Sequence, residues 1–149
     1  MKNTISFYTK FGWITASEIN NKITSIEFKK MKRIGKITKN LKKLREDMVN
    51  FFESKKKNIK SKIYLKGNAI QKRIWNEIKK IEFVDTKTYL EIAKKVSVSP
   101  RFVGRVCGQN KLLIVIPCHR VIRSDGLMGG YSANGGMLLK KKLINFEKN

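Results

Sequence analysis

The sequence contains one pair of residues with clear potential for covalent chemistry, a cysteine followed directly by the only histidine of the chain. Cys118 and His119 come after the apolar run 114–117, which ends in a proline. A thiol is a strong nucleophile only as the thiolate, and a nearby base or positive charge increases the thiolate fraction. Arg120 and Arg123 add positive charge close by. The pattern therefore predicts a nucleophilic cysteine.

The same pair also fits a structural role. We expect the apolar run to be a strand, and a cysteine after a strand is commonly a buried packing residue. Residues adjacent in a strand point to opposite faces, so adjacency alone does not give a hydrogen bond between Cys118 and His119. A Cys–His hydrolase is a further alternative, which predicts turnover of an ester or amide.

The sequence on both sides of Cys118 distinguishes between these alternatives. Asn110, the run Ile116–Val121 and the segment Gly129–Ser132, followed by a basic helix, resemble the active-site signature of the O6-alkylguanine-DNA alkyltransferases, also called methylated-DNA–protein-cysteine methyltransferases. The resemblance extends from about residue 70 to residue 147, and more weakly to Phe11–Ile14.

The resemblance implies a DNA repair enzyme that acts on double-stranded DNA with alkylated bases. Such a protein flips O6-alkylguanine, and by the same resemblance O4-methylthymine, out of the duplex and transfers the alkyl group irreversibly to Cys118. The thioether is stable, so each molecule acts once. The alternative is a non-catalytic DNA-binding module that recognises alkylated bases. Relatives of that kind replace the reactive cysteine, commonly with tryptophan, whereas Cys118 is intact.

The resemblance also implies roles for single residues. The residues expected to act in the chemistry are Cys118 as alkyl acceptor, His119 as its base through a water, Glu147 as the carboxylate that holds the imidazole, Tyr89 as the group that protonates the leaving guanine, and Asn110 as the brace of the strand that delivers the thiol. The residues expected to contact DNA are Arg101, Arg105, Tyr89 and Arg120. The residues expected to line the guanine pocket are Val121, Tyr131 and Ser132. No cofactor and no metal are implied.

The net charge of +23 predicts a polyanionic partner such as nucleic acid. Lysine-rich composition also arises from genome bias or heat adaptation, and the charge is spread over both halves of the chain. Two cysteines are too few for a disulfide framework, and no apolar run reaches the length of a membrane span. We therefore expect a cytoplasmic monomer with free thiols and no contact with a membrane.

The first half of the chain predicts a small sheet with one helix. The expected strands are Ile5–Tyr8, Trp13–Ala16 and Ile23–Phe28, with a further strand at Ser61–Lys66. Apolar residues at helical spacing predict an amphipathic helix over about 39–53, followed by a polar link at Lys55–Asn58.

The second half predicts helices. The isoleucines Ile70, Ile74, Ile78 and Ile81 line one face of a helix from about Ala69 to Lys80. A capping box at Thr88 opens a second helix, and Ser99 with Pro100 opens a third, which together predict a helix-turn-helix. Arg101 and Arg105 share one exposed face of its second helix. A last helix follows Gly135-Gly136.

The predicted fold class is α+β, in two domains. Residues 1–66 form a sheet-and-helix domain, which by resemblance is ribonuclease-H-like. Residues 67–149 form a helical winged-helix or helix-turn-helix domain that binds DNA and carries the alkyl acceptor.

Overall fold

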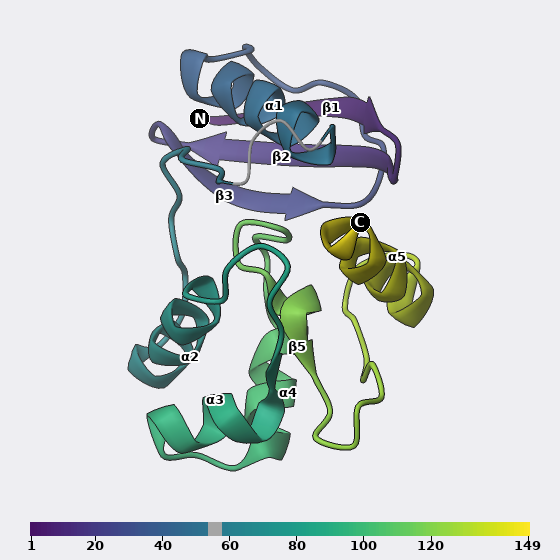
Figure 1. Ribbon diagram of the computed structural model, residues 1–149. Coiled ribbons are helices and arrows are strands. Elements are labelled where there is room, and N and C mark those ends of the chain that lie inside the picture. Colours follow the sequence, from purple (N-terminus) through teal and green to yellow (C-terminus); the bar gives the residue numbers. More distant parts are fainter. Residues whose placement is uncertain (54–57) are drawn as a thin grey trace. The chain divides into compact units, whose positions relative to one another are not determined.

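The computed structural model describes residues 1–53 and 58–149, so most of the predicted polar link at Lys55–Asn58 lies outside the described residues. The chain divides into two compact units, Met1–Lys66 and Gly67–Asn149. The first contains an antiparallel sheet and a helix, and the second is mostly helical (Figure 1). The predicted α+β fold class is confirmed.

The first unit is a three-stranded sheet of order β1-β2-β3. Its elements are β1 (Lys2–Thr9), β2 (Gly12–Ile19), β3 (Lys22–Glu27) and α1 (Lys39–Phe52). The three predicted strands are confirmed, and β1 and β2 are longer than expected. Asn20 and Asn21 form the β2–β3 turn with positive φ values of 51° and 63°, a conformation that asparagine tolerates better than most residues.

Helix α1 lies along one face of this sheet (Figure 1). It begins after Thr38, whose side-chain oxygen accepts a hydrogen bond from the Leu41 backbone N–H at 3.2 Å. Leu44 and Met48 on its apolar side are fully buried. The predicted helix is therefore confirmed, and packing against the sheet stabilises it.

The predicted strand Ser61–Lys66 is wrong. Only Ile63 forms a bridge, with Ile23 of β3. The buried Asn40 side chain bonds both the N–H and the C=O of Lys62, at 3.4 Å each. The segment is therefore held by the side chain of Asn40 and by one β-bridge, and it does not pair with β3 as a continuous strand.

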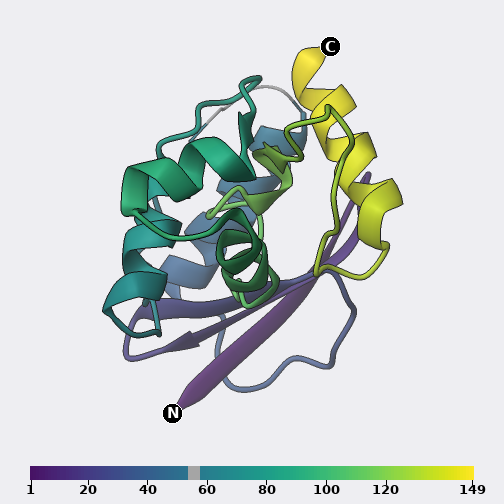
Figure 2. The same ribbon diagram turned by 90° about the horizontal axis from the view of Figure 1, so that it is seen from below.

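The second unit begins with helix α2 (Ala69–Lys79) and a helix-turn-helix formed by α3 (Tyr89–Val96) and α4 (Pro100–Gly108). The predicted caps are confirmed. Thr88 and Glu91 form a capping box for α3, and the Ser99 hydroxyl accepts the Phe102 N–H at 3.1 Å at the start of α4. Figure 2 shows these three helices as one group, in teal and green.

The chain then returns through a short parallel pair to the last helix. Strand β4 (Lys87–Thr88) pairs with β5 (Val121–Ile122), and α5 (Gly136–Lys148) ends the unit. Helix α5, in yellow, lies on the other side of β5 from the α2–α4 group (Figure 2). No helix within the described ranges has the length and apolar character needed to cross a membrane.

The predicted strand before Cys118 is also wrong. Ile114 has a positive φ of 72°, and the Ile116 N–H bonds the Leu112 carbonyl at 2.9 Å. The apolar run is therefore a compact turn, and Cys118–Arg120 form one turn of 3₁₀ helix, η1. Residues 112–114 and 116 are buried, so hydrophobicity alone did not distinguish a strand from a buried turn.

Candidate functional site

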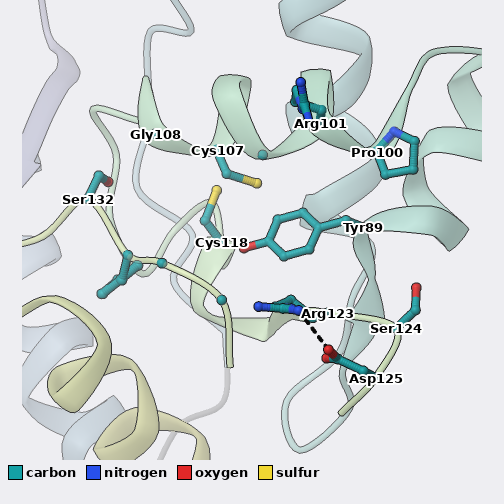
Figure 3. Close-up of a pocket in the computed structure, with 14 residues that line it drawn as sticks. Tyr89, Pro100, Arg101, Cys107, Gly108, Cys118, Arg123, Ser124, Asp125 and Ser132 are labelled. Carbon is teal, nitrogen blue, oxygen red and sulfur yellow. Dashed lines mark hydrogen bonds and ion pairs between the residues drawn. The ribbon is translucent and has the colours of Figure 1, made fainter. Parts of the chain in front are cut away.

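A cavity of about 1030 Å³ opens in the second unit, beside the helix-turn-helix. It lies between the start of α3, the helix α4, η1 and the loop 123–132 (Figure 3). Its lining residues are Tyr89, Pro100, Arg101, Gly104, Cys107, Gly108, Cys118, Arg123, Ser124, Asp125, Gly129, Gly130, Tyr131 and Ser132. The structure thus brings five of the residues singled out by the sequence to one cavity: Tyr89, Arg101, Cys118, Tyr131 and Ser132.

Cys118 lies in the wall of this cavity and is only 3 % exposed. The neighbouring thiol of Cys107, together with burial, raises the pKa of Cys118. The nearby side-chain amide of Asn110 and the positive charge of Lys140 act in the opposite direction and lower this pKa. The thiol is therefore neutral in the DNA-free protein, with two groups in place that favour the thiolate.

Asn110 holds the turn that carries the thiol. Its Nδ2 donates to the Ile116 carbonyl at 2.9 Å, and its Oδ1 accepts the Leu112 N–H at 2.8 Å. All these groups are buried. The predicted brace exists in geometric terms, although it braces a turn and not a strand.

His119 is fully buried and contacts Glu147 of α5. The Nε2 atom of His119 lies 2.6 Å from Oε2 of Glu147. Burial lowers the pKa of His119, and the hydrogen bond with Glu147 only partly offsets this effect. Burial also opposes charge on Glu147, but hydrogen bonds from His119 and Arg120 more than offset it and lower the pKa of this carboxyl. The resting state is thus a neutral imidazole against a carboxylate.

This arrangement fixes the tautomer of the imidazole. A proton on Nε2 of His119 donates to the Glu147 carboxylate, so Nδ1 keeps a lone pair. Within the described part of the chain, Nδ1 has no hydrogen-bond partner. The free Nδ1 lone pair can therefore accept a proton.

Arg120 does not fit the predicted contact with DNA. Its guanidinium is buried and donates to Glu147, Nε to Oε1 at 2.7 Å and Nη2 to Oε2 at 3.1 Å. Its Nη1 donates to the Ile81 carbonyl at 2.7 Å. Because the charge is neutralised and enclosed, we correct the prediction: Arg120 is a structural partner of Glu147.

Tyr89 points its hydroxyl toward Cys118 (Figure 3). Burial raises the pKa of Tyr89 to about 12, so the hydroxyl keeps its proton at neutral pH. Gly129, with a φ of +72°, lies against the ring: a Cβ at this position would come within 2.9 Å of the Tyr89 hydroxyl oxygen. A glycine at 129 is therefore required both by the backbone conformation and by the approach of Tyr89.

The two arginines of α4 occupy different positions. Both are exposed, but Arg101 lines the cavity and Arg105 does not. In the pocket, Ser132 and Tyr131 line the wall, whereas Val121 is fully buried and absent from the lining. Burial raises the pKa of Tyr131, and its hydroxyl has no hydrogen-bond partner among the described residues.

Sequence reasoning missed Lys140. This side chain is fully buried, and its Nζ donates to the Tyr89 hydroxyl oxygen at 3.2 Å and to the Gly130 carbonyl at 3.1 Å. In the sequence it is one of three consecutive lysines of a basic helix. Helical phase was the available signal, because Lys140 shares a face with Leu143 and Glu147.

Comparisons with known proteins show the family of this chain. Residues 69–149 match the family described as 6-O-methylguanine DNA methyltransferase, DNA binding domain. A methylated-DNA–protein-cysteine methyltransferase from Metallosphaera sedula is 34% identical over 144 residues, which cover 95% of this chain and 90% of that protein. A protein of the same name from Sulfolobus acidocaldarius is 41% identical over 98 residues, 66% of this chain and 61% of that one.

Solved structures share the fold. The O6-methylguanine methyltransferase of Mycobacterium tuberculosis superposes with a TM-score of 0.88 at 23% identity, covering 99% of this chain and 93% of that one. The O6-methylguanine DNA methyltransferase of Methanococcus jannaschii gives a TM-score of 0.73 at 25% identity, covering 97% and 93%. From the match over its second unit and the relative that spans nearly the whole chain, this protein belongs to the 6-O-methylguanine DNA methyltransferase family.

Proposed function

We propose that this chain is a DNA repair protein that transfers an alkyl group from O6-alkylguanine in duplex DNA to its own Cys118. The observation that carries the proposal is the placement of a cysteine thiol and a tyrosine hydroxyl, Cys118 and Tyr89, in one cavity next to the helix-turn-helix. Membership of the methyltransferase family supports the same reaction.

The first step is formation of the thiolate. The Cys118 proton passes through a water to Nδ1 of His119, and Glu147 stabilises the imidazolium that results. Arg120 keeps Glu147 ionised and oriented through its two hydrogen bonds. Asn110 and Lys140 favour the negative sulfur.

The sulfur then attacks the alkyl carbon, and the carbon–oxygen bond to guanine breaks. Guanine is a poor leaving group unless a proton neutralises the charge that develops on its ring, so a general acid accelerates the step. Tyr89 supplies this proton. Because Lys140 donates to the tyrosine oxygen, the O–H of Tyr89 stays free to donate into the cavity.

The target nucleotide must leave the stack to reach this cavity, because the alkylated oxygen lies inside the duplex. Extrusion costs a few kcal/mol, less for a base that pairs badly. Arg101, at the cavity and on the exposed side of α4, fills the gap left in the duplex. Arg105 lies outside the cavity and contacts phosphate, which provides affinity without sequence preference.

The pocket side chains Tyr131 and Ser132 receive the extruded base. The unpaired Tyr131 hydroxyl is available to an edge of guanine. O4-methylthymine offers a similar alkylated oxygen and is a second substrate of the same site. All proposed groups come from one chain, so a monomer suffices, and a reducing compartment such as the cytoplasm keeps the acceptor thiol free.

The product is a thioether, and no step of the scheme regenerates the thiol, so each molecule acts once. The test is a stoichiometry assay with excess duplex that carries one labelled O6-methylguanine, and a parallel series with O4-methylthymine. We expect close to one label per protein molecule. Trypsin separates the two cysteines into peptides 106–111 and 112–120, and the label belongs on the second.

The control is Cys118→Ala, which must remain unlabelled while it still binds the duplex. Tight binding of lesion DNA without any label on the wild-type protein would support the non-catalytic alternative. Repeated turnover would exclude the single-use scheme.

A further inference from the structure

A second thiol, Cys107, lies beside the alkyl acceptor, and the proposed transfer does not use it. Cys107 is in the last turn of α4 and is 8 % exposed, and both it and Cys118 line the same cavity. Neither is in a disulfide. The two side chains point toward one another in Figure 3.

Two thiols that line one cavity and point toward one another can approach to form a disulfide, whose sulfur atoms lie about 2.05 Å apart. Both cysteines lie at an end of a short helical segment. Gly108 follows Cys107 at the end of α4, and Cys118 begins the single 3₁₀ turn. The cavity gives small molecules a path to both sulfur atoms.

The electrostatic surroundings also favour sulfur chemistry at this pair. The buried Lys140 lies close enough for its charge to interact with both thiols. A cation in this position favours the thiolate of Cys118 against the opposing effect of burial, and a thiolate is the form that peroxides oxidise.

We propose that Cys107 and Cys118 form a reversible disulfide when peroxide enters the cavity. One thiolate attacks a peroxide oxygen and becomes a sulfenic acid, with release of water. The other thiol attacks that sulfur, the sulfur–sulfur bond forms, and a second water leaves. In sum, two thiols and one hydrogen peroxide give one disulfide and two waters, and the peroxide is the oxidant.

The consequence, which rests on the proposed function, is a protected acceptor. A lone sulfenic acid can be oxidised further to a sulfinic acid, which thiol reductants do not reverse, whereas a disulfide returns to two thiols. Alkyl transfer would stop while the disulfide exists and resume after reduction. Cys107 thus acts as the resolving thiol of the reactive centre.

The experiment treats the full-length wild type, Cys107→Ala and Cys107→Ser with hydrogen peroxide, blocks free thiols with a maleimide, and measures mass without reduction. For the wild type we expect loss of two hydrogen atoms, no maleimide, and a linked pair of tryptic peptides 106–111 and 112–120. For the two variants we expect added oxygen on Cys118. Cys107→Ser provides a second, polar replacement if alanine at this buried position weakens the fold.

The second readout is the recovery of alkyl-transfer activity after reduction. After dithiothreitol, labelling from O6-methylguanine DNA is compared with that of the same untreated protein. We expect nearly complete recovery in the wild type and a loss in both variants that grows with peroxide. Maleimide on Cys107 together with oxygen on Cys118 in the wild type would overturn the proposal. A linked peptide pair in a protein that never transfers methyl would instead preserve the disulfide and refute the proposed function.

Discussion

The buried amine of Lys140 donates a hydrogen bond to the hydroxyl oxygen of Tyr89 at a distance of 3.2 Å. Burial lowers the pKa of Lys140 to about 8, so the side chain is mostly protonated at neutral pH. Among the described residues, Lys140 hydrogen-bonds the Tyr89 hydroxyl and the Gly130 carbonyl, and neither neutralises its charge; a buried cation of this kind is costly in a protein interior. Its position next to the proposed acid and the proposed nucleophile indicates that function retains it.

We therefore expect Lys140→Met to separate stability from activity. Methionine has a similar size and no charge, so the free energy of unfolding at pH 7 should rise by about 1–3 kcal/mol. Labelling of Cys118 should slow by about tenfold or more, because both the thiolate and the orientation of the Tyr89 hydroxyl lose support. Urea unfolding and single-turnover labelling measure the two effects.

The same variant has a defined pH dependence. In the folded protein the pKa of Lys140 lies below its unfolded value, so the unfolded chain binds more protons between about pH 8 and 10.5. The stability of the wild type relative to Lys140→Met should therefore increase with pH across this window. A stability difference that does not change from pH 7 to pH 10 would contradict the assignment.

Glu147→Gln removes the charge that His119 and Arg120 share. We expect the free energy of unfolding to fall by about 3 kcal/mol, since a buried guanidinium loses its counter-ion. The labelling rate should fall by about 100-fold, because the imidazolium is no longer stabilised. Adding Arg120→Met to this variant should restore part of the stability and none of the rate. Equal stability of Glu147→Gln and the wild type would show that the ion pair is not formed.

Asn110→Ala tests the buried turn. The substitution leaves the Leu112 N–H and the Ile116 carbonyl without their partner, at a cost of about 1–3 kcal/mol for each group. Gln109→Ala is the matched control. The exposed side chain of Gln109, the residue before Asn110, accepts a hydrogen bond from Gln71, so we expect a change in the free energy of unfolding within about 0.5 kcal/mol. Denaturant titration of both variants provides the comparison.

Substitution of the two arginines of α4 should have different effects, one on the rate of labelling and one on the affinity for DNA. Arg101→Ala should slow labelling from duplex DNA by about tenfold and leave labelling from a single-stranded oligonucleotide nearly unchanged, since only a duplex has a gap to fill. Arg105→Ala should weaken binding to all duplexes alike and reduce the salt dependence by about one phosphate contact. Identical profiles for the two variants would refute the separate roles.

Alkylation itself should weaken the fold. A methyl group on Cys118 adds bulk at a position that is 3 % exposed. Inserting a methyl group into a packed site costs about 1–3 kcal/mol, which corresponds to a fall in melting temperature of several degrees. Thermal unfolding of labelled and unlabelled protein would show the shift, and coincident curves would exclude it.

Local signals explain what the sequence could predict. The start of α3 depends on Thr88 and Glu91, three residues apart, and the start of α4 depends on Ser99 and Pro100, so a short window contains the whole cause. The resemblance carried by the motif around Cys118 implied that Tyr89 acts at the same site, and both residues line one cavity.

Two of the predictions, the DNA contact of Arg120 and the strand before Cys118, were wrong because both features depend on contacts between residues that are not neighbours in the sequence. The buried state of Arg120 depends on Glu147, 27 positions away, and a basic residue beside a reactive cysteine gave no sign of it. The turn before Cys118 depends on how Asn110 uses both ends of its amide. In each case one tertiary partner determines the backbone conformation or the burial of the charge, and the periodicity of the sequence does not reveal that partner.

The position of Arg120 also has a consequence for the order of folding. Its guanidinium joins the carbonyl of Ile81, 39 positions earlier in the chain, to the carboxylate of Glu147, 27 positions later. Contacts of such long sequence separation form late, because the loops they close must first be ordered. A chain that has formed only its local helices would therefore hold Cys118 without its oriented histidine. Reactivity at this cysteine should appear with the final step of refolding and can serve as a kinetic probe of it.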